Sequence, residues 1–197
     1  MFQIQTKSDL INKYQKGVRD FQNTILTSIN LTDSNLEQIN LDRSNLIEIN
    51  WSNCNLIQTS FNEAHLCLSN FHQCSLMQAS LKGANLEQAN LQEANLEQAN
   101  LAGTNLTGAN LAGANLKGTN LSNTNLERTC FVGAVYDCET IFDSHVDPEA
   151  LKMVFTQILV SDQVNTNVSD KQNLGAVKKI FSWYRSSKLN LQAQDWS

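Results

Sequence analysis

The stretch Ala84–Leu101, ANLEQANLQEANLEQANL, repeats the unit Ala-Asn-Leu-x-x with almost no variation. Five residues of an α-helix advance about 140° past a full turn, so leucines five apart scatter around a helix. A strand alternates its faces at every residue, so leucines five apart would point to opposite faces. A chain that turns a corner every five residues instead brings every leucine inside. The spacing therefore predicts coils that stack into a solenoid, because no single unit can bury its apolar side alone.

The same spacing extends far beyond this stretch. If the recurring apolar residue is taken as the centre of each unit, centres run in steps of five from Phe21 to Ile141, which makes 25 units without an insertion. The residue two before a centre is mostly small, and the residue just before it is Asn in every unit from Asn85 to Asn125. Each unit thus has two inward side chains, one large and one small. The predicted core includes the centres Phe21, Trp51, Phe61, Phe71, Leu86, Leu96, Leu106, Leu116, Leu126 and Phe131.

These units resemble the pentapeptide-repeat family, whose consensus is A(D/N)LXX, over roughly residues 19–145. The resemblance implies an all-β solenoid: a right-handed quadrilateral β-helix with four units per coil, roughly six coils, and no enzyme activity of its own. Glu139 stands where a small inward residue belongs, so we expect the regular coil to degrade near it. Five more positions depart from the consensus: Ile29, Ile39 and Ile49 replace a small residue, and Ile25 and His65 replace Asn or Asp.

The centres alternate between two sets, each with a period of ten residues, and the aromatic centres fall in one of them. Trp51, Phe61 and Phe71 belong to one alternating set of centres, whereas the other set is all Leu from Leu26 to Leu126. In a four-sided coil such an alternation joins opposite sides. We therefore expect one opposite pair of sides to have roomier corners or different turns, and we expect Phe71 to stack one coil above Trp51.

Both flanks of the repeats are expected to cover an open end of the solenoid. A short N-terminal helix is predicted from Ser8, as N-cap, to Lys16, with Gly17 as its stop. The lead-in GVRDF and the exit segment after Gly133 resemble those of cyanobacterial members. The predicted organisation is an N-terminal cap helix and lead-in (1–18), a pentapeptide-repeat β-helix (19–145), and a C-terminal helical cap, linker and tail (146–197).

Two C-terminal helices are predicted within residues 146–197. Asp147 is a good N-cap and Pro148 a good first residue, and Leu151, Val154 and Phe155 begin a spacing of three and four residues. A second helix over about 174–187 carries aromatic residues that could anchor a homodimer or another partner, or could pack on a neighbouring element. These residues are Phe181, Trp183 and Tyr184.

Composition excludes several classes of protein. No run of about 18 apolar residues predicts a transmembrane helix, and the N-terminus lacks the apolar region of a secretory signal. We therefore expect a cytoplasmic chain without membrane contact. The five cysteines show no CxxC and no Cys/His pair, so neither a metal nor a cofactor is expected. Cys54 and Cys74, both inward, should stack at a spacing that nearly suits a disulfide, although reduced packing thiols fit a cytoplasmic chain better.

Outward apolar residues mark candidate contacts with a protein partner. Ile47, Cys67 and Leu68 should lie on one side of the coil, and Ile57 and Met77 on the opposite side. A terminal segment that covers these residues is an alternative reading, as is neutral variation. Since no nucleophile–base arrangement is visible, we expect a non-catalytic interaction or scaffold module with an unidentified protein partner.

The alternative function is a DNA mimic that binds DNA gyrase, as some members of this family do. Residues 19–145 hold 13 Asp/Glu and 5 Lys/Arg, a net of −8. DNA carries about one charge per 1.7 Å, which is well above −8 over a length of about 30 Å. Direct binding to nucleic acid is not expected of an acidic surface.

A gyrase supercoiling assay with purified protein separates the two functions. A mimic inhibits or protects the enzyme at tens of micromolar protein, whereas a scaffold for another partner leaves supercoiling unchanged. A flat titration would remove the mimic.

Overall fold

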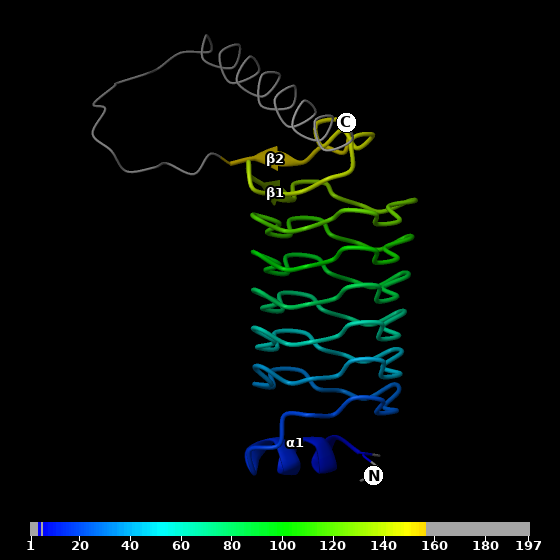
Figure 1. The fold of residues 1–197 in the computed structure, drawn as a ribbon, viewed down its shortest axis with the longest axis vertical. Helices are drawn as coiled ribbons and strands as arrows, with labels where there is room; N and C mark the ends of the chain where they lie inside the picture. The colour runs from blue at the N-terminus through cyan, green and yellow to red at the C-terminus, as the bar shows by residue number, and fades with distance from the viewer. Residues whose placement is uncertain (1–3, 5, 157–197) are drawn as a thin grey trace, which may run out of the picture. The chain divides into compact units, whose positions relative to one another are not determined.

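The computed structural model describes Ile4 and residues 6–156, which form a column of stacked coils (Figure 1). One α-helix, α1 (Lys7–Gln15), lies at one end of the column. Two short strands, β1 (Val135–Tyr136) and β2 (Val154–Phe155), lie at the other end. The predicted linker, the second C-terminal helix and its aromatic residues Phe181, Trp183 and Tyr184 lie outside the described residues.

Parallel bridges between equivalent residues of successive coils hold the column together. One ladder begins at Asp20 and Asn40, and three more begin at Ile25, Asn30 and Asn35. Four ladders in every coil make a four-sided coil, as the resemblance to the family implied. The sides are called first to fourth here, after the centres Phe21, Leu26, Leu31 and Leu36. Each bridge is a single residue wide, so few residues count as strand; the right-handed sense and the number of about six coils stay predictions.

The corners are alike on all four sides, so the expectation of two kinds of turn is wrong. The residue two after each centre from Phe21 to Phe131 has a positive φ, as at Asp33 (59°) and Gln38 (60°). In most units the next N–H then donates to the carbonyl of the centre, as from Ser34 to Leu31 at 3.1 Å. Because the backbone sets this corner, a larger centre does not alter it.

The centres fill the interior. All predicted core centres are buried except Leu126, which packs against the core but is only partly buried. Its N–H finds no acceptor among the described residues, whereas the N–H of Leu106, one coil earlier, donates to Asn125 at 2.9 Å. The rings of Trp51 and Phe71 stack with centroids 6.0 Å apart and an interplanar angle of 6°, which confirms the predicted stacking.

Small polar and Asn side chains satisfy the backbone. Inward hydroxyls donate to the carbonyl of a centre in the preceding coil, as from Thr104 to Leu81 at 2.9 Å. Asn side chains accept from the N–H two positions later, and some also donate to the Asn one coil earlier, as from Asn90 to Asn70 at 3.0 Å. The Asn columns therefore have a structural role.

Helix α1 covers the core at the N-terminal end. Its N-cap is Thr6 rather than Ser8, because the Thr6 hydroxyl accepts from the N–H of Asp9 at 3.1 Å. Gly17 ends the helix with φ +89°, as predicted. Leu10 is fully buried, and the Tyr14 hydroxyl donates to the carbonyl of Glu37 at 2.9 Å. The helix thus joins the core and the rim of the first coil.

One inserted residue breaks the repeat near Glu139, close to where degradation was expected. Ile141 pairs with Asn120, although the regular step would pair Asn120 with Thr140. Ile141 is therefore not a centre, and its side chain is 43% exposed. Phe142 packs in its place, with its ring 5.7 Å from that of Tyr136. The Asp137 carboxylate stabilises the lengthened coil, because it accepts hydrogen bonds from the N–H groups of Gly118 and Thr140 at 3.0 and 3.1 Å.

The helix predicted from Asp147 does not form within the described residues. Asp147 does accept from the N–H of Glu149 at 3.0 Å, but the turn ends at Lys152, which has φ +59°. Val154 and Phe155 then form β2, which runs parallel to β1. The spacing of the apolar residues fits both structures, and pairing with the last coil decides between them because it satisfies an exposed backbone edge.

We predict that Trp51→Phe changes stability by less than about 1.5 kcal/mol, although Trp51 is fully buried. The indole Nε1 of Trp51 is buried without a hydrogen-bond partner among the described residues. Removing an unsatisfied donor recovers about 1–3 kcal/mol, which offsets the lost packing. The free energy of unfolding from denaturant titration checks this.

Phe71→Ala is the matched control, since it removes a neighbouring ring without removing a polar group. It should cost about 3–5 kcal/mol. If both variants lose the same stability, the indole N–H has a partner in solution.

Candidate partner-contact surface

Three outward apolar residues gather on the second side. Ile47 and Cys67 each follow a centre, and they lie in adjacent coils, because the N–H of Glu48 donates to the carbonyl of Cys67 at 3.0 Å. Leu68 is the next residue and is 51% exposed. We call Ile47, Cys67 and Leu68 the second-side patch. The structure brings these three together as predicted.

Leu68 has an unusual backbone for its side chain. Its φ is +60°, and in residues 6–156 it is the only apolar residue other than glycine with a positive φ. A left-handed conformation costs a residue with a Cβ about 1–2 kcal/mol, and Asn or Gly adopts it more easily. Because half of its surface stays exposed, Leu68 gains less burial than an inward leucine to offset this cost. Folding alone therefore favours Asn or Gly at this position.

The Asn column of the second side is interrupted beside the patch. His65 stands where most other coils have Asn, and it is exposed. Asn45, one coil earlier, has an Oδ1 that is buried without a partner among the described residues. On the fourth side, by contrast, Asn115 donates to Asn95 at 3.0 Å. The regular pattern of hydrogen bonds is thus incomplete at the patch.

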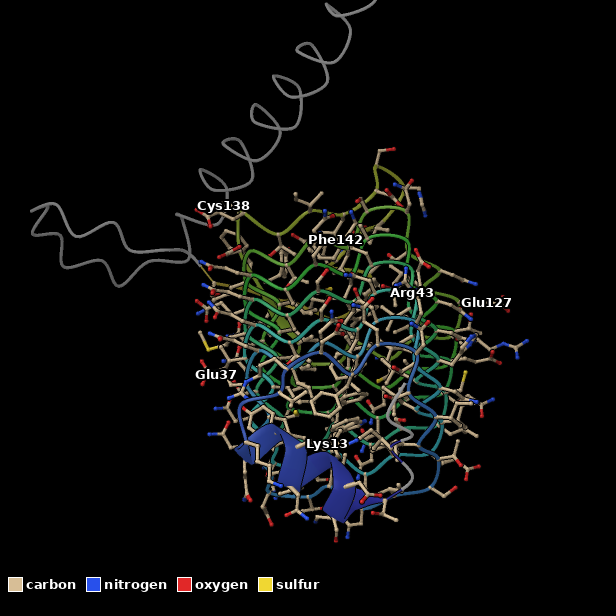
Figure 2. The ribbon with its side chains drawn as sticks, turned by 60° about the horizontal axis from the view of Figure 1, so that its bottom comes forward. Lys13, Glu37, Arg43, Glu127, Cys138 and Phe142 are labelled. Atoms are coloured by element: carbon tan, nitrogen blue, oxygen red, sulfur yellow. The ribbon has the colours of Figure 1, made fainter. Side chains whose placement is uncertain are left out.

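Ile57 and Met77 lie on the fourth side. Both side chains are half-buried, as are Ile47 and Cys67, so the patch differs from them by the exposed Leu68. They adjoin a ladder of glutamine side chains, in which Gln58 donates to Gln78 at 2.9 Å. Figure 2 shows that the two sides are opposite, since Glu37 of the fourth side and Glu127 of the second side point away from each other. A flat partner cannot touch both groups at once.

Two carboxylates flank the patch along the column, and the sequence reasoning did not connect them with it. Glu48 lies one coil before Leu68, and Glu87 one coil after, because the N–H of Leu68 donates to the carbonyl of Glu87 at 3.0 Å. Within residues 6–156 neither carboxylate has a cationic partner; the ion pair on this side joins Arg128 to Glu127 at 3.5 Å. Burial, and then Glu87, raise the pKa of the Cys67 thiol. Equivalent residues of successive coils are 20 apart, so counting back from Leu68 to Glu48 and forward from Cys67 to Glu87 could have revealed both carboxylates.

Cys54 and Cys74 are free, buried thiols in adjacent coils. Cys54 donates to the carbonyl of the centre Leu31 at 3.0 Å, as the inward hydroxyls do, whereas Cys74 donates to the carbonyl of Cys54 at 3.1 Å. Burial raises the pKa of Cys54 from 9.0 to about 11 and also raises the pKa of Cys74. Both thiols stay protonated at neutral pH and pack as small apolar residues.

No candidate metal centre is found in the described part of the chain. No three of its His, Cys, Asp and Glu side chains are placed to hold a metal ion. An open hollow at the C-terminal end is lined by Glu97, Lys117, Asp137 and Glu139, among others. The buried Asp137 carboxylate accepts from backbone N–H groups there, so it serves the fold. Residues 6–156 also contain no helix long and apolar enough to cross a membrane.

The repeat identifies the class of protein. The sequence model described as pentapeptide repeats matches in 8 copies within residues 34–73, 69–108, 79–118 and 99–135, which together span more than half of the chain. The chain therefore belongs to the pentapeptide-repeat family. A comparison with curated proteins gives no match.

Among solved structures, two cyanobacterial proteins are similar. HetL from Nostoc sp. strain PCC 7120, a pentapeptide-repeat protein involved in heterocyst differentiation regulation, is 28% identical over 70% of this chain and 64% of its own, with a TM-score of 0.39. Rfr23 from Cyanothece 51142 is 31% identical over 68% of this chain and 99% of its own, with a TM-score of 0.41.

A pentapeptide-repeat protein of the Arabidopsis thaliana thylakoid lumen is 33% identical over 48% of this chain and 66% of its own, with a TM-score of 0.46. This chain thus spans just under two thirds of HetL and of the Arabidopsis protein. All three TM-scores are low, so the assignment to the family depends on the repeat match.

We predict that stability falls as pH rises from about 9 to 11, because the pKa of Cys54 moves from 9.0 to about 11 on folding. The native state keeps the thiols protonated, so their contribution is complete below pH 9 and is lost as the unfolded thiols ionise. The loss is on the order of 2 kcal/mol, measured by denaturant titration at several pH values.

The double variant Cys54→Ala, Cys74→Ala should flatten this dependence, since Ala is the usual residue at this position of the repeat. Cys138→Ala, which removes an exposed thiol, is the control and should keep it. An identical pH dependence in wild type and the double variant would contradict the assignment to these thiols.

Proposed function

We propose that this protein is a non-catalytic interaction or scaffold module, and that the second-side patch contacts a protein partner. The solenoid supplies a stiff surface, because each coil is bonded to the next on four sides. The outward side chains of such a surface can be exchanged without disturbing the inward ones. A fold of this kind is therefore well suited to binding a protein partner.

Leu68 carries the proposal. It combines 51% exposure with a left-handed φ of +60°, and both features oppose its presence on folding grounds alone. Apolar side chains that are exposed in a cluster commonly mark interaction sites. Ile57 and Met77 remain a second candidate contact with weaker support, because no exposed apolar residue like Leu68 accompanies them.

The other expectations from the sequence keep the status of predictions. No specific observation favours gyrase binding. A DNA mimic needs its carboxylates on one surface, whereas Glu127 on the second side and Glu37 on the fourth side face in opposite directions (Figure 2). A homodimer through Phe181, Trp183 and Tyr184 concerns residues outside the described part. A cytoplasmic location and the absence of enzyme activity belong to the proposal as well.

Leu68→Asn should abolish capture of the partner while it leaves stability equal or higher. Asn adopts the left-handed conformation more easily than Leu, so the variant relieves strain of up to about 1 kcal/mol. The measurement is quantitative affinity capture from the source organism, together with denaturant titration of each purified variant.

Gln73→Asn is the matched control, because Gln73 lies in the same coil on the third side and has φ +56°. It should retain every partner that wild type captures. If Leu68→Asn also captures an unchanged set of partners, the patch is not a contact surface.

A further inference from the structure

The chemistry of the second side points to the kind of partner that the patch fits. This inference rests on the proposed function and concerns the same surface. Glu48 occupies the position of Leu68 one coil earlier, and Glu87 occupies the position of Cys67 one coil later, so the two carboxylates flank the patch along the column. Glu48 accepts from the Ser28 hydroxyl at 2.8 Å, but within residues 6–156 neither carboxylate meets a cation. An acidic frame around an apolar centre favours a partner with the opposite charges.

Backbone pairing does not provide a binding mode at this place. The N–H groups of Glu48 and Leu68 already donate to Cys67 and Glu87 at 3.0 Å, and the N–H of Leu66 donates to Asn85 at 2.8 Å. Since the patch lies in the middle of the column, a strand cannot add to it as it would to an open sheet edge. The partner must bind through its side chains.

The spacing of the carboxylates suits a helix. Glu48 and Glu87 are two coil steps apart, which is about 10 Å at about 4.8 Å per step. In an α-helix, positions i and i+7 are about 10.5 Å apart on one face, with positions i+3 and i+4 between them. A helix along the column could place Lys or Arg at both outer positions and an apolar residue over Leu68.

We propose that the second side binds an amphipathic helix of a partner protein, with an apolar stripe on Leu68, Cys67 and Ile47. Basic residues one turn to either side of that stripe pair with Glu48 and Glu87. The carboxylates of the exposed Glu48 and the half-buried Glu87 add specificity and salt dependence, and the apolar contact supplies most of the affinity.

A designed peptide tests this chemistry. The probe is a fluorescein-labelled helical peptide of about four turns with Leu at i+3 and i+4 and Lys at i and i+7, and its scrambled sequence is the control. Fluorescence anisotropy should show binding of the helical probe, weakened about fivefold by Glu48→Gln with Glu87→Gln. Raising the salt concentration should weaken wild type more than this variant.

Asp33→Asn with Glu93→Gln is the matched control, since it removes two carboxylates from the third side. Its affinity should equal that of wild type. Equal binding of helical and scrambled probes, or equal loss in both double variants, overturns the inference because the acidic charge then acts without a site.

Affinity capture separates this inference from the proposed function. If Leu68→Asn loses the captured partner and Glu48→Gln with Glu87→Gln keeps it, the patch is a contact site but the partner is not a basic helix. If both variants keep it, the proposed function and this inference fail together.

Discussion

The structure depends on backbone hydrogen bonds between groups that lie one coil apart along the chain. Each coil offers N–H and C=O groups to the next on all four sides, as where Leu86 donates to Asn105 at 2.8 Å and Asn105 donates to Ala84 at 3.0 Å. An unpaired buried backbone group is costly, so the length of chain in each coil must stay constant. Regularity of the repeat follows from this constraint.

The response to one inserted residue shows how strict the constraint is. Between Tyr136 and Ile141 the ladder step grows by a single position. The Asp137 carboxylate then accepts the N–H of Gly118, whereas the equivalent N–H of Gln98, one coil earlier, donates to a backbone carbonyl. Thr140 still donates to the carbonyl of a centre, Leu116, at 2.9 Å. The coil absorbs the insertion only because a side chain replaces a backbone acceptor.

The same constraint leaves the outward side chains free to serve function. Small inward residues and Asn columns are tied to the backbone, whereas the two residues after each centre face solvent at a corner of fixed shape. Leu68 is informative for this reason: its corner would form more easily with Asn or Gly. Its presence at this corner is the observation on which the proposed contact surface depends.

The five-residue spacing by itself determined a solenoid with inward centres, because neither a helix nor a strand places every fifth residue on one face. Four units per coil came from the resemblance to the family, and with that number the spacing stacks Phe71 on Trp51 and groups Ile47, Cys67 and Leu68. Tertiary structure decided what local pattern leaves open. Val154 and Phe155 suit either a helix or a strand, and the exposed edge of the last coil selected the strand. Ile141 is apolar and follows Tyr136 by five residues, so the sequence alone shows no break in the period there. Only the pairing of Ile141 with Asn120 reveals the inserted residue. The left-handed φ of Leu68 likewise comes from the coil, because a corner imposed by four bonded neighbours overrides the preference of a single side chain.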